Sequence, residues 1–269
     1  MRFSWNRWLE PSNGPCPVCG KRSAGGKTAA CPVRHPEAAS VLRQLCTACA
    51  ETIPWIRKPV CRVCGRSIAC PDCPRRAERA LSFSRGAVRY DAAMKDWLAM
   101  YKYRGSEKLE AVMAAMAAFG YERILTELRT GTDAASFVAV TAVPLAAERL
   151  AERGFNQAER MARTLAGWYS LPYRPLLKRN RHTEKQSLKS RRGRLEDMRG
   201  NFSPNPAAFS MLTSSQPDET CRILLVDDVY TTGSTLQECA RSIRLAVASQ
   251  PANAQDRRVE VYGLAWARS

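Results

Sequence analysis

Two adjacent aspartates near the C-terminus carry the clearest chemical signal in this chain. Residues 223–226 form the apolar run Ile-Leu-Leu-Val, and Asp227 and Asp228 follow directly. A continuous apolar run of this length is typical of a buried strand in a parallel sheet, so both acids should lie at the carboxyl end of that strand. Carboxylates placed there suit ribose hydroxyls or a bound Mg²⁺ ion, which binds oxygen ligands.

The residues after the acids are small and polar, as in a phosphate-binding turn. They are Thr231, Thr232, Gly233, Ser234 and Thr235, and a helix is expected over 236–246. Backbone N–H groups that precede a helix, together with the helix dipole, favour a phosphate monoester. This stretch lacks the Gly-Lys-Ser/Thr of a Walker A loop, and the sequence contains no GxGxxG run of a dinucleotide site.

A second chemical signal is the clustering of cysteines before residue 74. Nine of the 11 cysteines lie there, and eight of them form four CxxC pairs. The pairs are Cys16/Cys19, Cys46/Cys49, Cys61/Cys64 and Cys70/Cys73. Two such pairs supply the four thiolates of a tetrahedral structural zinc site, which leaves no open position for catalysis. Disulfide bonds are disfavoured, because residues 1–11 lack the apolar stretch of an export signal and the cytoplasm is reducing.

The pairing of the four CxxC motifs stays open at this point. In-order pairing would place the first two motifs on one ion and the last two on another. A crossed arrangement, or one site with motifs left over, uses the same cysteines. Cys31 and His35 lie between the first two motifs and could also act as ligands.

The elements that position these residues predict two domains. Residues 1–80 hold the CxxC pairs and several prolines, which indicates a small zinc-binding module made of turns. Residues 81–269 alternate strand-like and helical segments, which predicts an α/β domain with a largely parallel sheet and flanking helices. Strands are expected over 83–90, 137–141, 173–177 and 259–266, and helices over 92–101 and 108–128, with Asn156 capping a further helix.

The net charge of +17 points to a polyanionic partner. Residues 1–80 carry 14 basic and 5 acidic side chains, and residues 174–199 carry 10 and 3. Residues 178–205 form a long basic segment with few large apolar side chains, which is typical of a lid or a disordered spacer, and a short helix is expected over 191–199. No apolar run approaches the ~20 residues of a membrane-spanning helix, so we expect a cytoplasmic protein.

Taken in order, several motifs resemble the ComF family (ComFC/GntX-like, phosphoribosyltransferase-related competence proteins). The motifs are the four CxxC pairs, 102–105 (KYRG), 143–145 (VPL), 153–157 (RGFNQ), 181–186 (RHTEKQ) and the acidic strand. The resemblance implies a type I phosphoribosyltransferase-like fold that binds PRPP together with Mg²⁺. Asp227 and Asp228 would then be the catalytic acids on the ribose hydroxyls, and residues 231–235 would hold the 5′-phosphate. The region 181–199 would match the flexible lid that closes over the site, and Arg153, Arg181 and Gln186 would lie near the pyrophosphate or this lid.

Three functions remain in view. The first is a competence or DNA-uptake accessory protein with a PRPP site and a basic surface for single-stranded DNA. The second is an active phosphoribosyltransferase that transfers the phosphoribosyl group to a base and releases pyrophosphate, although no segment after strand 259–266 resembles a base-binding hood. The third is a zinc-nucleated scaffold that docks a helicase or another DNA-processing protein.

Overall fold

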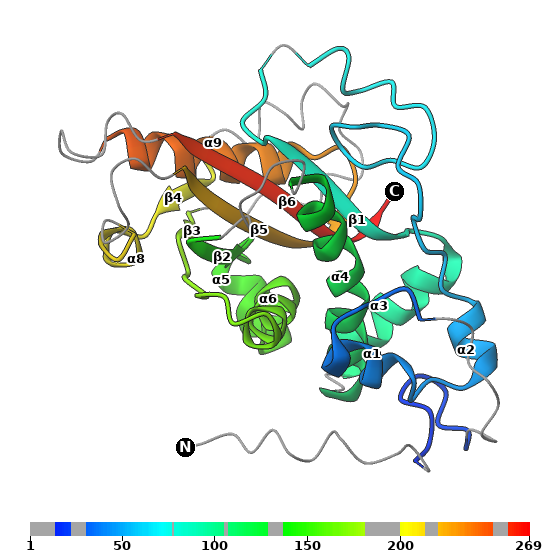
Figure 1. The fold of residues 1–269 in the computed structure, drawn as a ribbon. Helices are drawn as coiled ribbons and strands as arrows, with labels where there is room; N and C mark the ends of the chain where they lie inside the picture. Colours follow the sequence, from blue (N-terminus) through cyan, green and yellow to red (C-terminus); the bar gives the residue numbers. More distant parts are fainter. Residues whose placement is uncertain are drawn as a thin grey trace.

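The structure is a computed structural model that describes residues 14–22, 31–76, 78–104, 107–128, 137–180, 200–212, 220–249 and 258–269. Its central feature is a sheet of four parallel strands in the order β1-β6-β5-β2 (Figure 1). The strands are β1 (Phe83–Arg89), β2 (Ala139–Ala142), β5 (Cys221–Tyr230) and β6 (Val259–Arg268). The predicted α/β class with a parallel sheet is confirmed.

Helices cover both faces of this sheet (Figure 1). Helices α4 (Glu107–Leu128) and α6 (Gln157–Trp168) lie on one face, and α9 (Ser234–Ala248) lies on the other. On β5, Leu224 and Val226 pack towards α4 and α6, whereas Ile223 and Leu225 pack towards α9. Burial on both faces explains why this strand is a continuous apolar run rather than an alternating one.

The strand register leaves the two aspartates open on one side. Val226 of β5 pairs with Ala142, the last residue of β2, and Asp227 pairs with Ala265 of β6. Strand β2 therefore ends one residue before the acids, as expected from Pro144, because proline lacks the N–H needed to continue a ladder. The acids have a neighbouring strand only on the β6 side.

The remaining described elements are short or lie around the sheet. They are α1 (Pro36–Leu42), α2 (Thr47–Glu51), α3 (Ala92–Arg104), α5 (Ala147–Arg153), α8 (Pro206–Ser210) and the antiparallel pair β3 (Leu177–Arg179) and β4 (Phe202–Pro204). None of the helices in the described ranges combines the length and apolar character needed to cross a bilayer.

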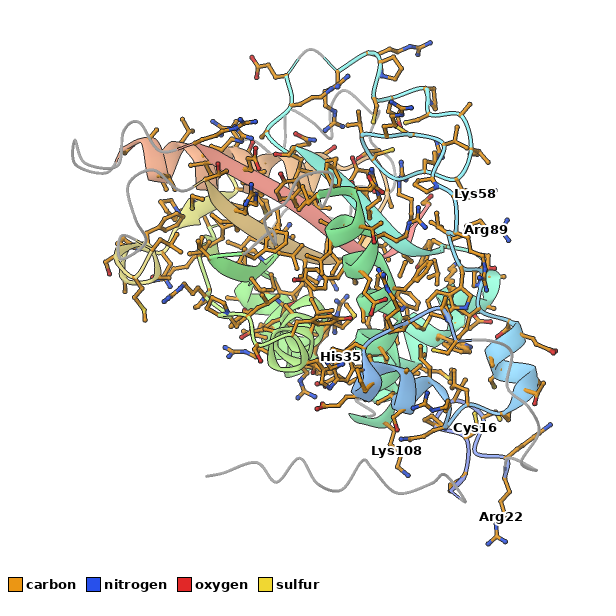
Figure 2. All side chains as sticks on the ribbon, viewed as in Figure 1. Cys16, Arg22, His35, Lys58, Arg89 and Lys108 are labelled. Atoms are coloured by element: carbon orange, nitrogen blue, oxygen red, sulfur yellow. The ribbon has the colours of Figure 1, made fainter. Side chains whose placement is uncertain are left out.

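The N-terminal residues pack onto helix α4, and a buried carboxylate fastens them. The side chain of Glu122 on α4 accepts hydrogen bonds from Arg34 N (3.0 Å), His35 N (2.9 Å) and the Tyr169 hydroxyl (2.8 Å). Glu122 is only 5% exposed, so it satisfies backbone donors at the start of α1 out of contact with water. Figure 2 shows His35 between α1 and the body of the molecule.

The strand expected over 173–177 is wrong. Tyr173 makes one isolated parallel bridge to Val140, and the next strand is β3, which pairs with β4. Pro172 and Pro175 flank Tyr173, and neither can donate the backbone hydrogen bond that a longer ladder requires. The lid over 181–199 and the short helix over 191–199 fall outside the described residues.

Candidate functional site

The acid pair, Asp227 and Asp228, lies in the last third of β5. Asp228 N donates to Asp227 Oδ1 at 2.9 Å, and Val229 N donates to Asp228 Oδ1 at 2.7 Å. These two bonds orient both carboxylates by the backbone of their own strand. Lys102 Nζ on α3 lies 2.7 Å from Asp228 Oδ2, and the Asp228 side chain keeps 23% exposure.

The two acids have opposite electrostatic environments. Burial raises the pKa of Asp227 well above its usual range, and the negative charge of Asp228 raises it further. Burial would also raise the pKa of Asp228, but the charge and hydrogen bond of Lys102 lower it overall. Asp228 therefore carries the negative charge of the pair, while Asp227 is the more readily protonated partner.

The β5–α9 turn, residues 231–233, follows the acid pair and leads into helix α9. Gly233 occupies the N-cap position with φ +79°, and the structure shows no side-chain cap there. Thr232 Oγ1 and Ser234 Oγ lie 2.9 Å apart. Helix α9 begins two residues earlier than expected, so Ser234 and Thr235 lie in its first turn. Backbone donors at such a helix start favour an anion.

Arg153 lies at the end of α5, beside the same edge of the sheet. Its guanidinium contributes to lowering the pKa of Asp228, so it acts on the acid pair electrostatically, and Arg153 Nη1 donates to Gln157 Oε1 at 3.3 Å. The predicted cap at Asn156 is confirmed, because its side chain accepts from the first-turn N–H groups of α6. Arg181 and Gln186 fall outside the described residues.

The eight CxxC cysteines form two groups in the in-order arrangement. The first cluster is Cys16, Cys19, Cys46 and Cys49, and the second cluster is Cys61, Cys64, Cys70 and Cys73. Within each cluster the sulfurs lie within 4.8 Å of one another. Neither Cys31 nor His35 joins them, and the His35 ring instead packs 4.5 Å from the ring of Tyr169.

The sulfur spacing in both clusters fits a zinc ion. Cys19 Sγ and Cys46 Sγ are 3.6 Å apart, as are Cys64 Sγ and Cys70 Sγ. A tetrahedral ion with bonds of about 2.3 Å separates its sulfurs by about 3.8 Å. All eight cysteines are free of disulfide bonds. The clusters could therefore each hold one structural zinc.

Sequence reasoning assigned no partner to two basic residues that the structure places at the site. Lys102 belongs to the motif at 102–105, but its contact with Asp228 spans 126 positions of sequence, and no local sequence pattern predicts it. Arg268, the last residue of β6, donates to the Tyr230 and Thr231 carbonyls at the start of the β5–α9 turn. Such contacts arise only when the parallel strands are assembled.

No family model matches the sequence, but curated relatives do. The chain is 29% identical over 209 residues to competence protein ComFC of Bacillus subtilis, a match that covers 74% of this chain and 78% of the relative. It is 30% identical over 208 residues to competence protein ComFC of Streptococcus pneumoniae, covering 76% of this chain and 83% of the relative. Competence protein F of Haemophilus influenzae is 33% identical over 128 residues, 47% of this chain and 49% of the relative.

Proposed function

The chain belongs to the ComF family of competence proteins, and from that premise we propose that it assists DNA uptake by binding a ribose 5-phosphate such as PRPP and single-stranded DNA. The observation that carries the ribose-phosphate part is the sequence of groups along β5. Two oriented carboxylates come first, and an uncapped helix start follows within six residues. A ribose 5-phosphate carries both kinds of group, hydroxyls and a phosphate monoester, in one ligand.

The architecture supports a type I phosphoribosyltransferase-like fold. The acids lie at the carboxyl end of a central parallel strand, where ligands bind in open α/β sheets. Asp227 and Asp228 offer the oxygen ligands that Mg²⁺ prefers, so they could hold Mg²⁺ together with PRPP. A bound Mg²⁺ would neutralise part of the pyrophosphate charge. Lys102 and Arg153 add positive charge beside the same carboxylates.

The ribose-phosphate proposal is tested by calorimetry with ribose 5-phosphate, and with PRPP plus Mg²⁺. Hydrogen bonds contribute about 1.5–3 kcal/mol when one group is charged and about 0.5–1.5 kcal/mol when both are neutral, so Asp228→Asn should weaken binding by about 10-fold to 150-fold and Asp227→Asn by about 2-fold to 10-fold. Asp96→Asn, an exposed change on α3, serves as the matched control and should bind like the unmodified chain. Absence of binding of both ligands to the unmodified, zinc-loaded chain would overturn the proposal.

Phosphoribosyl transfer is the second candidate, favoured by the cations beside the acid pair. In that reaction the C1–O bond to pyrophosphate breaks, and a ring nitrogen of a base bonds to C1 and loses its proton to solvent. Lys102 and Arg153 would stabilise the leaving pyrophosphate, because preorganised positive charge acts where negative charge develops. Pyrophosphate release across a panel of bases is the assay. A flat panel with measurable PRPP binding would leave a binding protein without turnover.

Single-stranded DNA binding is supported by basic and aromatic groups near the first cluster. A cavity of about 250 Å³ there is lined partly by Trp55, Arg43 and Arg57. The Trp55 ring packs edge-on against Phe119, with centroids 5.1 Å apart, and the Trp55 side chain is only partly buried. Exposed arginines around an aromatic ring suit phosphates and a stacked base. Figure 2 shows two further basic side chains, Lys58 and Arg89, near each other at one edge of the molecule.

The DNA proposal predicts a salt-dependent affinity for a labelled oligonucleotide, measured by fluorescence anisotropy. The slope of log affinity against log salt is negative, and each phosphate contact that is removed should make it less steep by about 0.7. Arg43→Gln together with Arg57→Gln should therefore make it less steep by about 1.4. Arg258→Gln, an exposed arginine beside Glu260, is the matched control. An oligonucleotide that does not bind even at low salt would refute this part. A helicase or other protein partner rests on the family resemblance alone and stays a prediction.

A further inference from the structure

Arg268 connects the second cluster to the β5–α9 turn. Its side chain is buried, with the whole residue 3% exposed. Arg268 Nη2 donates to Cys64 Sγ at 3.4 Å, and Nη1 donates to the carbonyl oxygens of Tyr230 at 3.0 Å and Thr231 at 2.8 Å. The guanidinium carbon also lies 4.4 Å from the centroid of the Tyr230 ring. One buried cation thus touches both a cysteine of the second cluster and the peptide groups of the turn.

A second arginine, Arg76, makes a parallel connection. Its backbone N–H bonds to the Cys73 carbonyl at 3.4 Å, and its side-chain Nη2 donates to the Thr232 carbonyl at 2.8 Å. The carbonyls of three consecutive residues, 230–232, are therefore held by two arginines that contact the second cluster. Because the peptide bond is planar and trans, each held carbonyl sends the next N–H in the opposite direction. The N–H groups of residues 231–233 are thereby oriented away from the cluster.

The second cluster is itself fixed to the sheet. Ser84 N of β1 donates to the Val63 carbonyl at 2.8 Å, between two cysteines of the cluster. A Cβ on Gly65 would lie 2.8 Å from Ser84 O, so this CxxC turn packs directly against the strand. Cys64 and Cys73 belong to the same apolar cluster as Tyr230 and α9. A change in the geometry of the second cluster would therefore shift the close-packed residues of β1, β5 and α9 around it, because these described residues pack against it with no solvent layer between them to absorb the change.

Charge explains why the metal matters for Arg268. Among the interactions of the described residues, Arg268 bonds to carbonyl oxygens and to the Cys64 sulfur, and it pairs with no Asp or Glu side chain. A buried cation is costly unless negative charge lies close to it. Four thiolates around one Zn²⁺ carry a net charge of −2, whereas four neutral thiols carry none. Metal loading would supply the counter-charge that holds the guanidinium in place.

The first cluster offers an internal comparison. It packs with α1 and α4 in the apolar cluster on the opposite face of the sheet from α9. Figure 1 places the segment around Cys16 beside α1 and α2, away from α9, and Figure 2 labels Cys16 there. Both clusters present four sulfurs, but within the described ranges only the second is joined to the β5–α9 turn by the bonds given above. The two clusters should therefore differ in their effect on the turn.

We propose that the second cluster, acting through Arg268 as a positioning residue, sets the affinity of the β5–α9 turn for the 5′-phosphate of its ligand. Metal loss from this cluster releases the carbonyls of residues 230–232, so the N–H groups that face the phosphate lose their common direction. Metal loss from the first cluster leaves them in place. This inference rests on the proposed ribose-phosphate site and assigns its regulation to one of the two metal centres.

The test uses full-length chains in which one cluster at a time is emptied. Cys61→Ser with Cys70→Ser empties the second cluster without altering Cys64, and Cys19→Ser with Cys46→Ser empties the first. Elemental analysis should show one zinc per chain in each double variant. Ribose 5-phosphate should bind at least tenfold more weakly to the second-cluster variant, and within twofold of the unmodified chain to the first-cluster variant. Equal losses in both variants would overturn the proposal.

Two further measurements separate positioning from general loss of structure. Arg268→Lys keeps the charge but not the fork of donors, so it should retain both zinc ions and still lose about tenfold in ribose 5-phosphate affinity. Arg163→Lys is the matched control, because its guanidinium lies 4.1 Å from the Tyr173 ring, far along the sequence from the turn. Unchanged binding by Arg268→Lys would refute the coupling.

Amide hydrogen exchange reports on the coupling without any ligand. Exchange of residues 231–235 should accelerate in the second-cluster variant and not in the first-cluster variant. If the unmodified chain binds no ribose 5-phosphate while this difference is seen, the proposed function fails and the coupling stands. If ribose 5-phosphate binds but exchange at the turn is the same in both variants, the coupling fails and the proposed function stands.

Discussion

Replacing Gly233 by alanine should disable the β5–α9 turn through two separate physical effects. The first is conformational, because Gly233 has φ +79°, a region in which an L side chain is strained. The second is steric, because a Cβ at this position would lie 2.1 Å from the Tyr230 hydroxyl oxygen and 2.2 Å from the ring carbon that bears it. Tyr230 is buried at 3% exposure, so its ring has little room to withdraw.

The structure allows the two effects to be separated with a matched glycine. Gly154 has φ +74°, but a Cβ added there would meet no other atom within 4 Å. Gly154→Ala should therefore cost only the conformational effect, about 1–2 kcal/mol. Gly233→Ala should cost the same amount plus about 1–3 kcal/mol for the displaced tyrosine ring, a total of about 2–5 kcal/mol.

Urea denaturation followed by circular dichroism measures both free energies of unfolding, and calorimetry with ribose 5-phosphate measures the turn directly. Gly233→Ala should be the less stable variant by about 1–3 kcal/mol and should bind ribose 5-phosphate at least tenfold more weakly. Equal destabilisation by the two alanines would refute the steric reasoning. Undiminished binding by Gly233→Ala would refute the role given to the turn.

Three other outcomes follow from the same contacts. Elemental analysis of the purified chain should give two zinc ions, and their removal by a strong chelator should lower the thermal midpoint; a count of one or none contradicts the two-cluster arrangement. Asp227→Asn should stabilise the fold at pH 8 and not near pH 4. The raised pKa of Asp227 means that the folded state holds this proton, so the wild-type chain loses stability as the pH rises above the pKa that Asp227 has in the unfolded state. Denaturation curves in which the Asn variant is less stable than the unmodified chain at pH 8 would contradict this. Glu122→Ala should lower the free energy of unfolding, measured in urea, by about 3 kcal/mol, because it leaves buried backbone donors without an acceptor. The exposed Glu148→Ala should lower it by less than about 0.5 kcal/mol. Similar losses in the two variants would refute the role given to Glu122.

Local pattern was sufficient for the acidic strand and its surroundings. The apolar run before Asp227 predicted β5 because a central parallel strand is buried on both faces, and the polar turn and helix after it followed from their composition. The start of α9 was placed two residues late, because Ser234 and Thr235 have weak helix propensity and Gly233 supplies the cap only through its left-handed backbone.

Long-range contacts were beyond the reach of sequence. Four identical CxxC spacings gave no preference between in-order and crossed pairing, which depends on how the chain folds back. The pairing of Lys102 with Asp228, and the bonds of Arg268 to Cys64 and the turn, connect segments that lie far apart in the chain. The strand expected near Tyr173 failed for a local reason, since its two flanking prolines block a longer ladder.

The place of β6 in the sheet has a consequence for how the molecule is made. Its residues follow those of β1, β2 and β5 in the chain, yet they lie between β1 and β5 in the finished sheet. Strand β1 therefore gains its partner only after β2 and β5 have been synthesised, and closing that separation carries a large entropic penalty. The cysteine clusters are complete much earlier in synthesis and can bind metal while the sheet is still open. A nascent chain would thus carry a formed metal centre long before Arg268 arrives to join it to the turn.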